Sequence, residues 1–144
     1  MSNHAGSYML NDILQMLERE QVFALLGREK TQRLVLDIIK RAQDNDCNYG
    51  EILDNGVAER LGICRYCLNA GQSFQYGLCD ECRKKEIDWW RKHCLDSLCR
   101  WHPRAGAKVR TAVNNCTDLP ALKAVESHAA EWSLQDILRR LTGR

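Results

Sequence analysis

The stretch with Cys64-Arg-Tyr-Cys67 at one end and Cys79-Asp-Glu-Cys82 at the other decides how the middle of this chain folds. The two cysteine pairs share one spacing, and the eleven residues 68–78 separate them. Thiolates at this spacing face one ion when the backbone turns tightly at each pair, and two such turns complete a tetrahedron of sulfurs. We therefore predict that these four cysteines bind one Zn²⁺ ion. Iron also accepts four sulfur ligands, and the pattern leaves zinc and iron open.

Residues 62–98 resemble a treble-clef or zinc-ribbon finger, in which a knuckle, a short hairpin and a second knuckle at a helix start hold one ion. The hairpin is expected at Ser73-Phe-Gln-Tyr76, between Gly71 and Gly77, and a helix is expected over residues 83–98. The resemblance implies a module that binds DNA, RNA or protein. Since four thiolates leave no position for water, the ion is expected to be structural rather than catalytic.

The use of cysteine agrees with this interpretation. The N-terminal residues have neither a basic stretch nor an apolar run of the kind that directs secretion, so we expect a cytoplasmic protein in a reducing compartment. In such a compartment, eight cysteines with two CxxC pairs indicate a metal site rather than a disulfide framework. A thioredoxin-like redox motif needs a βαβ setting, and neither pair has one.

Length and composition favour a mainly helical protein. The 144 residues are 44 % apolar and 28 % charged, which is typical of globular proteins and excludes a disordered chain. Only two prolines are present, which disfavours an all-β sandwich, and no apolar run approaches the length of a membrane span. We predict a mainly α fold with a small irregular or β-hairpin zinc knuckle, which makes it α+β. Three regions are expected: N-terminal helices over 1–61, the finger and its basic helix over 62–100, and C-terminal helices over 101–144.

Local signals place several helix ends. Thr31 is a candidate N-cap for the second long helix, and Gly62 is a candidate C-terminal stop. Asn55-Gly56 is expected to divide residues 49–61 into two short helices. Thr117 or Asp118 precedes a helix with proline in its first turn, and Ser133-Leu-Gln-Asp136 resembles a capping box.

A second set of metal-ligating side chains follows the finger. Cys99-Arg-Trp-His102 has ligand-like spacing. Cys94, however, falls on the apolar stripe of its expected helix, where a cysteine behaves as a small hydrophobic residue. The sequence therefore leaves two interpretations, core thiols or a second metal site, and the members of that second site are Cys94, Cys99, His102 and Cys116.

Positive charge is concentrated beside the finger. Residues 83–110 hold nine Lys/Arg against three Asp/Glu, although the whole chain has a net charge of only +2. Basic side chains at helical spacing neutralise successive phosphates, while Trp89, on the same side, could stack on a base or on a partner surface. The predicted nucleic-acid-binding residues are Arg83, Lys84, Lys85, Arg91, Lys92, Arg100 and Arg104.

Two other function classes are disfavoured. A helix-turn-helix over residues 49–66 would need its recognition helix where Cys64 and Cys67 stand. HNH-type nucleases, which also use a treble clef, place a catalytic histidine between the two cysteine pairs, whereas residues 68–78 contain none. No phosphate-binding loop, HExxH motif or nucleophile elbow is present. We expect no enzymatic activity.

The sequence thus predicts a small cytoplasmic zinc protein that binds nucleic acid, DNA rather than RNA, and acts in transcriptional control. The alternative is a zinc-stabilised adaptor that docks on a regulatory protein partner, such as a polymerase subunit, without touching DNA. No membrane association is expected.

Overall fold

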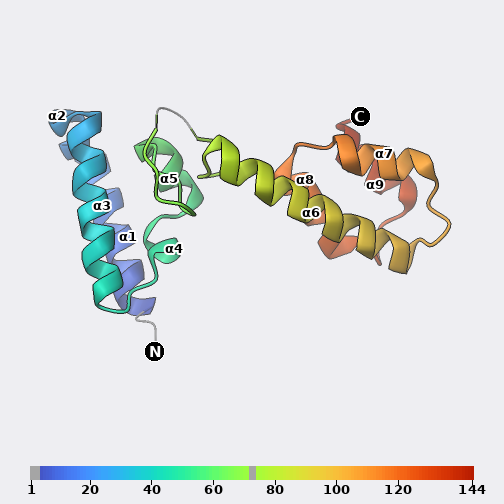
Figure 1. Ribbon diagram of the computed structural model, residues 1–144, viewed down its shortest axis with the longest axis horizontal. Helices are drawn as coiled ribbons and strands as arrows, with labels where there is room; N and C mark the ends of the chain where they lie inside the picture. Colours follow the sequence, from blue (N-terminus) through green and yellow to red (C-terminus); the bar gives the residue numbers. More distant parts are fainter. Residues whose placement is uncertain (1–3, 72–73) are drawn as a thin grey trace. The chain divides into compact units, whose positions relative to one another are not determined.

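The computed structural model of the protein describes residues 4–71 and 74–144 (Figure 1). Within these residues the chain forms nine helices and no strand, which confirms the mainly helical prediction. None of these helices is both long enough and apolar enough to cross a membrane. In chain order they are α1 (His4–Arg19), α2 (Val22–Leu26), α3 (Arg28–Asp44), α4 (Tyr49–Ile52), α5 (Asn55–Leu61), α6 (Asp80–Trp101), α7 (Ala107–Asn115), α8 (Leu119–His128) and α9 (Leu134–Thr142).

The prediction of a β-hairpin in the cysteine segment, and with it the α+β class, is wrong for the described residues. Tyr76 and Gly77, at φ 59° and 68°, make a tight left-handed turn between Gln75 and Leu78, but backbone pairing does not extend beyond that one pair. Ser73, where the hairpin was expected to begin, lies outside the described residues. The segment forms two isolated antiparallel bridges, Ile63 with Ala70 and Gln75 with Leu78.

The chain divides into two compact units, Met1–Arg83 and Lys84–Arg144, with the division inside α6. The first unit holds the N-terminal helices together with the four-cysteine segment, which the sequence analysis treated as separate regions. The second unit holds the rest of α6 and the three C-terminal helices.

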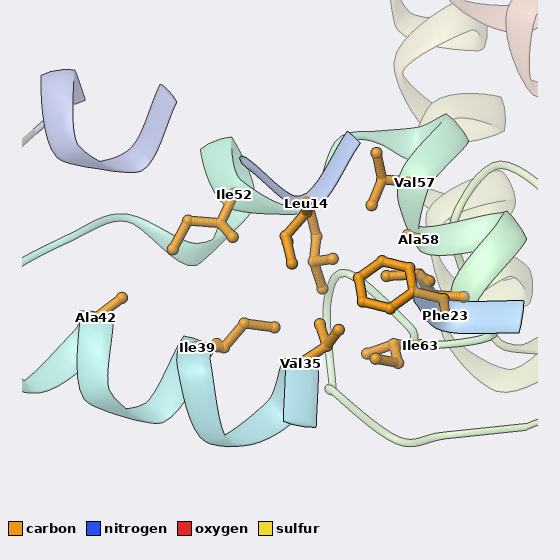
Figure 2. Close-up of a cluster of buried hydrophobic side chains, with 11 residues drawn as sticks. Leu14, Phe23, Val35, Ile39, Ala42, Ile52, Val57, Ala58 and Ile63 are labelled. Atoms are coloured by element: carbon orange, nitrogen blue, oxygen red, sulfur yellow. The ribbon is translucent and has the colours of Figure 1, made fainter. Parts of the chain in front are cut away.

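The N-terminal unit has an apolar core between α1, α3, α5 and the cysteine segment. Figure 2 shows Leu14 of α1 pointing toward Val35 and Ile39 of α3. Ile63, the residue before the first cysteine of the segment, is fully buried in this cluster. Complete burial of such a side chain contributes about 1.5–3 kcal/mol. The buried members are Leu14, Phe23, Val35, Ile39, Ala42, Ile52, Leu53, Val57, Ala58, Leu61 and Ile63.

Helix ends in this unit follow some of the predicted signals. Residues 49–61 form two short helices as predicted, but they are divided at residues 53–54, and Asn55-Gly56 begin the second helix instead of separating the two. The Asp54 side chain caps the second helix by accepting from the backbone N–H of Val57 at 2.8 Å. The N-cap prediction for Thr31 is wrong because Gly27, at φ 81°, precedes α3. The hydroxyl of Thr31 instead donates to the carbonyl of Phe23 at 3.1 Å inside the unit.

The C-terminal unit has its own buried stripe on each helix. Asp118 caps α8 by accepting from Ala121 at 3.1 Å, and Ser133 caps α9 by accepting from Asp136 at 3.1 Å. Both helices therefore begin where the sequence predicted, and the choice between Thr117 and Asp118 falls on Asp118. The buried stripes consist of Ile87, Cys94 and Leu98 on α6, Val109 and Val113 on α7, Leu119, Leu122 and Val125 on α8, and Ile137 and Leu141 on α9.

Candidate metal centre

The four cysteines predicted as ligands lie together. The sulfurs of Cys64, Cys67, Cys79 and Cys82 are all within 4.8 Å of one another, and those of Cys67 and Cys79 are 3.7 Å apart. A tetrahedral zinc–thiolate centre with bonds of about 2.3 Å places its sulfurs about 3.8 Å apart. The donor set and its spacing therefore fit a single zinc ion.

The first knuckle grows out of the end of α5. Gly62 ends the helix as predicted, in the left-handed conformation at φ 68°, and turns the chain so that Ile63 enters the core. Cys64, fully buried, then donates its backbone N–H to Asn69 at 2.9 Å, while its carbonyl accepts from Leu68 at 2.8 Å. These two hydrogen bonds close the loop over residues 64–69, which carries the sulfurs of Cys64 and Cys67.

Gly62 also lacks room for any side chain. A Cβ at this position would lie 2.4 Å from the carbonyl oxygen of Gly71 and 2.2 Å from the guanidinium of Arg28. The close approach of Gly71 to Gly62 allows a hydrogen bond, in which the backbone N–H of Gly71 donates to the carbonyl of Gly62 at 2.7 Å. Glycine is thus required at position 62 both for the backbone conformation and for the approach of the two ends of the loop.

The second knuckle leads directly into α6. Gly77, at φ 68°, precedes buried Leu78, and its backbone N–H donates to the carboxylate of Glu59 at 3.1 Å. Its carbonyl accepts from the N–H of Arg65 at 2.8 Å, which ties the two knuckles together. Cys79 is the residue before α6, so the second pair of thiols lies in the first turn of a helix, where the positive end of the helix dipole favours thiolates.

Two side chains of α3 brace the first knuckle. Gln32 Nε2 lies 3.0 Å from the carbonyl of Leu61, 3.2 Å from that of Gly62 and 3.0 Å from that of Gly71. Arg28 donates to the same Gly71 carbonyl at 3.0 Å. Neither residue was predicted from the sequence, because nothing in their spacing relates them to cysteines some thirty positions away. The brace connects the metal segment to the helical part of its unit.

The protonation of the four thiols differs with their surroundings. Burial opposes the Cys64 thiolate, but backbone N–H groups of both CxxC segments donate toward its sulfur and lower its pKa to about 7. Burial raises the pKa of Cys67 and of Cys82, and neighbouring sulfurs raise the pKa of Cys82 further. Four thiolates this close repel one another, and a divalent cation at their centre supplies the missing compensation.

The second candidate set is not assembled. In the described ranges, 4–71 and 74–144, the first set is the only group of three or more metal-ligating side chains close together. Cys94 is buried and donates to the carbonyl of Leu122 at 2.9 Å, and burial raises its pKa to about 12. Cys116 is also buried, with its sulfur 3.7 Å from the carbonyl of Asp118. Both behave as core thiols.

Cys99 and His102 have different surroundings. Cys99 is exposed, and both side chains line a pocket of about 280 Å³ whose other walls are mostly apolar. The Nε2 atom of His102 lies 2.7 Å from the carbonyl of Ala129, so this hydrogen bond holds the ring against the unit.

The predicted nucleic-acid-binding residues fall into two groups. The guanidinium of Arg83 pairs with Asp80 at 3.0 Å and donates to Gln75 at 3.2 Å. That of Arg91 donates to the carbonyl of Cys116 at 2.9 Å and pairs with Asp88 at 3.2 Å. These two arginines are therefore engaged within the chain. The side chains of the other five are exposed: Lys84, Lys85, Lys92, Arg100 and Arg104.

Two tryptophans of α6 are at the surface. Trp89 is 51 % exposed and stacks on His93, with ring centroids 3.5 Å apart and planes 24° apart. Trp101 is 55 % exposed at the end of the helix. The other two tryptophans, Trp90 and Trp132, are half-buried.

Comparison with protein-family models, with curated proteins and with solved structures gave no match to this chain.

Proposed function

We propose that this protein is a zinc-binding regulatory protein that binds DNA and acts in transcriptional control. The observation that carries the proposal is the separation of charge between the two units. Residues 1–83 hold nine Lys/Arg against twelve Asp/Glu, whereas residues 84–144 hold twelve against seven. A small unit with a net charge of +5 attracts the phosphate backbone of nucleic acid, and its neighbour at −3 does not.

The metal has a structural part in this proposal. All four donors are thiols, so a bound zinc ion has no open position at which to activate water or substrate. What it supplies is folding free energy to a segment that has no strand in the described residues and whose apolar anchors are Ile63 and Leu78. The chain's own residues do the rest: Gly62 and Gly77 shape the knuckles, and Gln32 holds the first one in place.

The proposal is tested by titrating the metal-loaded protein into a fluorescently labelled duplex of random sequence. If about four phosphates are contacted, the slope of log K against log salt is about −3.6, and affinity falls about 150-fold between roughly 50 and 200 mM salt. Absence of binding at the lowest salt concentration, with the metal and the helical content intact, would refute DNA binding.

A second candidate, an adaptor that docks on another protein, is favoured by one feature of α1. Met9, Ile13 and Met16 recur at positions i, i+4 and i+7 and are 64 %, 42 % and 54 % exposed, so they form an apolar row that faces solvent. The adaptor predicts no retention on DNA and co-purification of one defined partner that Ile13→Asp releases. Retention on DNA that Ile13→Asp leaves unchanged would favour the first function.

A further inference from the structure

The positive charge of the C-terminal half of the chain is not spread evenly. Residues 80–96, the first part of α6, hold five Lys/Arg and five Asp/Glu. Residues 97–117, which cover the end of α6, the turn after it and α7, hold four Lys/Arg and no acidic residue. The net charge of the two segments is therefore zero and +4. We call residues 97–117 the acid-free segment.

The first part of α6 is poorly suited to phosphate. An acidic residue precedes a basic one by four positions at Glu81 and Lys85 and again at Asp88 and Lys92. Residues four apart lie on one face of a helix, and the acid-before-base order is the favourable one for such pairs. The carboxylate of Asp88 also pairs with Arg91. Each cation on this face thus has a carboxylate one turn away, and the attraction for a polyanion is largely cancelled.

Within the acid-free segment only Arg100 has such compensation, because Asp96 lies four positions before it on α6. The other three cations have no acidic residue within four positions in the sequence. Arg104, Lys108 and Arg110 are exposed, and none of them forms an ion pair within the described ranges 4–71 and 74–144. Two hollows flank α7, one lined partly by Arg110 and the other partly by Lys108. Neither hollow has an acidic residue in its lining. These three cations are therefore exposed to solvent without a carboxylate paired to any of them in the described part of the chain.

α7 is anchored on one side and accessible to a ligand on the others. Val109 and Val113 are buried and fix it to its unit, while every other position is exposed or half-buried. All of its exposed polar side chains can donate hydrogen bonds, and none of them is a carboxylate. Arginine, lysine and asparagine are among the residues that pair with base edges in the major groove. An α-helix with its side chains is about 10–12 Å across, a diameter that a major groove about 12 Å wide admits. The exposed polar residues are Lys108, Arg110, Thr111, Asn114 and Asn115.

We propose that the acid-free segment, rather than the first part of α6, is the surface that contacts duplex DNA. Arg104, Lys108 and Arg110 contact phosphates, Arg100 lies at the edge of this surface, and α7 faces the groove. The inference rests on the proposed function, since it names the part of the C-terminal unit that carries out DNA binding.

The test compares two triple variants of the full, metal-loaded chain. In R104Q/K108Q/R110Q, three cations of the acid-free segment are removed; in the matched control K84Q/K85Q/K92Q, three exposed lysines of α6 are removed. Both lower the net charge by the same amount. On a random-sequence duplex, the first variant is expected to bind more than about tenfold more weakly, with a salt slope smaller in magnitude by about 2.7. The control is expected to keep most of the affinity and the slope.

Circular dichroism and metal content, measured on each variant, separate loss of contact from loss of fold. Equal losses in the two variants, or a larger loss in the α6 variant, would overturn the assignment while leaving DNA binding itself in place. Failure of the unmodified chain to bind duplex DNA would instead remove the proposed function. Binding confined to single-stranded RNA or DNA, with no affinity for the duplex, would also overturn the inference.

Discussion

Cysteines have different structural roles in the two units of this protein. In the N-terminal unit, four of them converge to within 4.8 Å, and backbone N–H groups donate toward the sulfur of Cys64. In the C-terminal unit, Cys94 and Cys116 are buried, and the sulfur of each lies next to a backbone carbonyl. Both units bury apolar side chains of their own, but within the described residues only the N-terminal unit also brings together thiols that could hold an ion. The comparison shows that the local turn, and not the number of cysteines, makes a metal site.

The largest effect is expected from breaking the centre itself. Cys79→Ser removes one of four ligands, so the variant is expected to lose its metal and to lower the free energy of unfolding of the N-terminal unit by more than about 3 kcal/mol. Cys99→Ser, at an exposed position outside the centre, is the matched control and is expected to retain both metal and stability. Thermal unfolding and metal analysis report the two changes. A Cys79→Ser protein that melts like the parent would show that the ion does not hold this unit together.

Replacing three glycines by alanine separates the cost of a strained backbone from the cost of crowding, beginning with Gly62 at the end of α5. Gly62→Ala meets both a positive φ and a carbonyl 2.4 Å away, and is expected to cost more than about 2 kcal/mol. Gly143→Ala has the same positive φ in open space and is expected to cost about 1–2 kcal/mol. Gly106→Ala has neither and is expected to be nearly neutral. Denaturant unfolding of the three variants gives the order, and equal costs at positions 62 and 143 would mean that the approach of Gly71 is unimportant.

In the C-terminal unit, the comparison predicts an effect on packing and none on metal. Cys94→Ala removes a buried sulfur that donates to Leu122, and is expected to cost about 1–2 kcal/mol through lost packing and an unpaired carbonyl. The metal content per chain is expected to stay the same. Loss of metal in this variant would revive the second site that the structure leaves unassembled.

The smallest effect is expected from the brace. Gln32→Ala removes the amide that lies within hydrogen-bond distance of three carbonyls of the first knuckle, and is expected to cost about 1 kcal/mol and to weaken metal retention against a chelator. Gln43→Ala, an exposed glutamine on the same helix, is the control. If the two variants release metal at the same rate, α3 does not stabilise the centre.

How far the sequence predicted this molecule depends on how local each signal is. The CxxC spacing, the helix start after Thr117 or Asp118 and the stop at Gly62 act within a few residues, and the structure confirms all three, with Asp118 as the cap. The β-hairpin prediction was wrong for the described residues because the two bridges of the cysteine segment are each a single pair long. The left-handed turn that closes the second bridge at Tyr76-Gly77 could not be recognised from the sequence.

Contacts between residues that are far apart in the chain could not be predicted from the sequence. The brace by Gln32 and the internal hydrogen bonds of Arg91 arise only when the helices pack. Counting charges over residues 83–110 as one segment concealed the alternation of acid and base along α6 and the absence of acid after it. That second pattern was readable in the sequence, but only the helix boundaries showed where to divide the count.

The account as a whole depends on four sulfurs holding one ion. X-ray absorption at the zinc edge of freshly purified protein tests this most directly, because it reports ligand type and bond length together. The expected result is one zinc per chain with four sulfur neighbours at about 2.3 Å. A spectrum with nitrogen or oxygen neighbours in the inner sphere, or protein that contains no zinc or iron, would contradict the central claim.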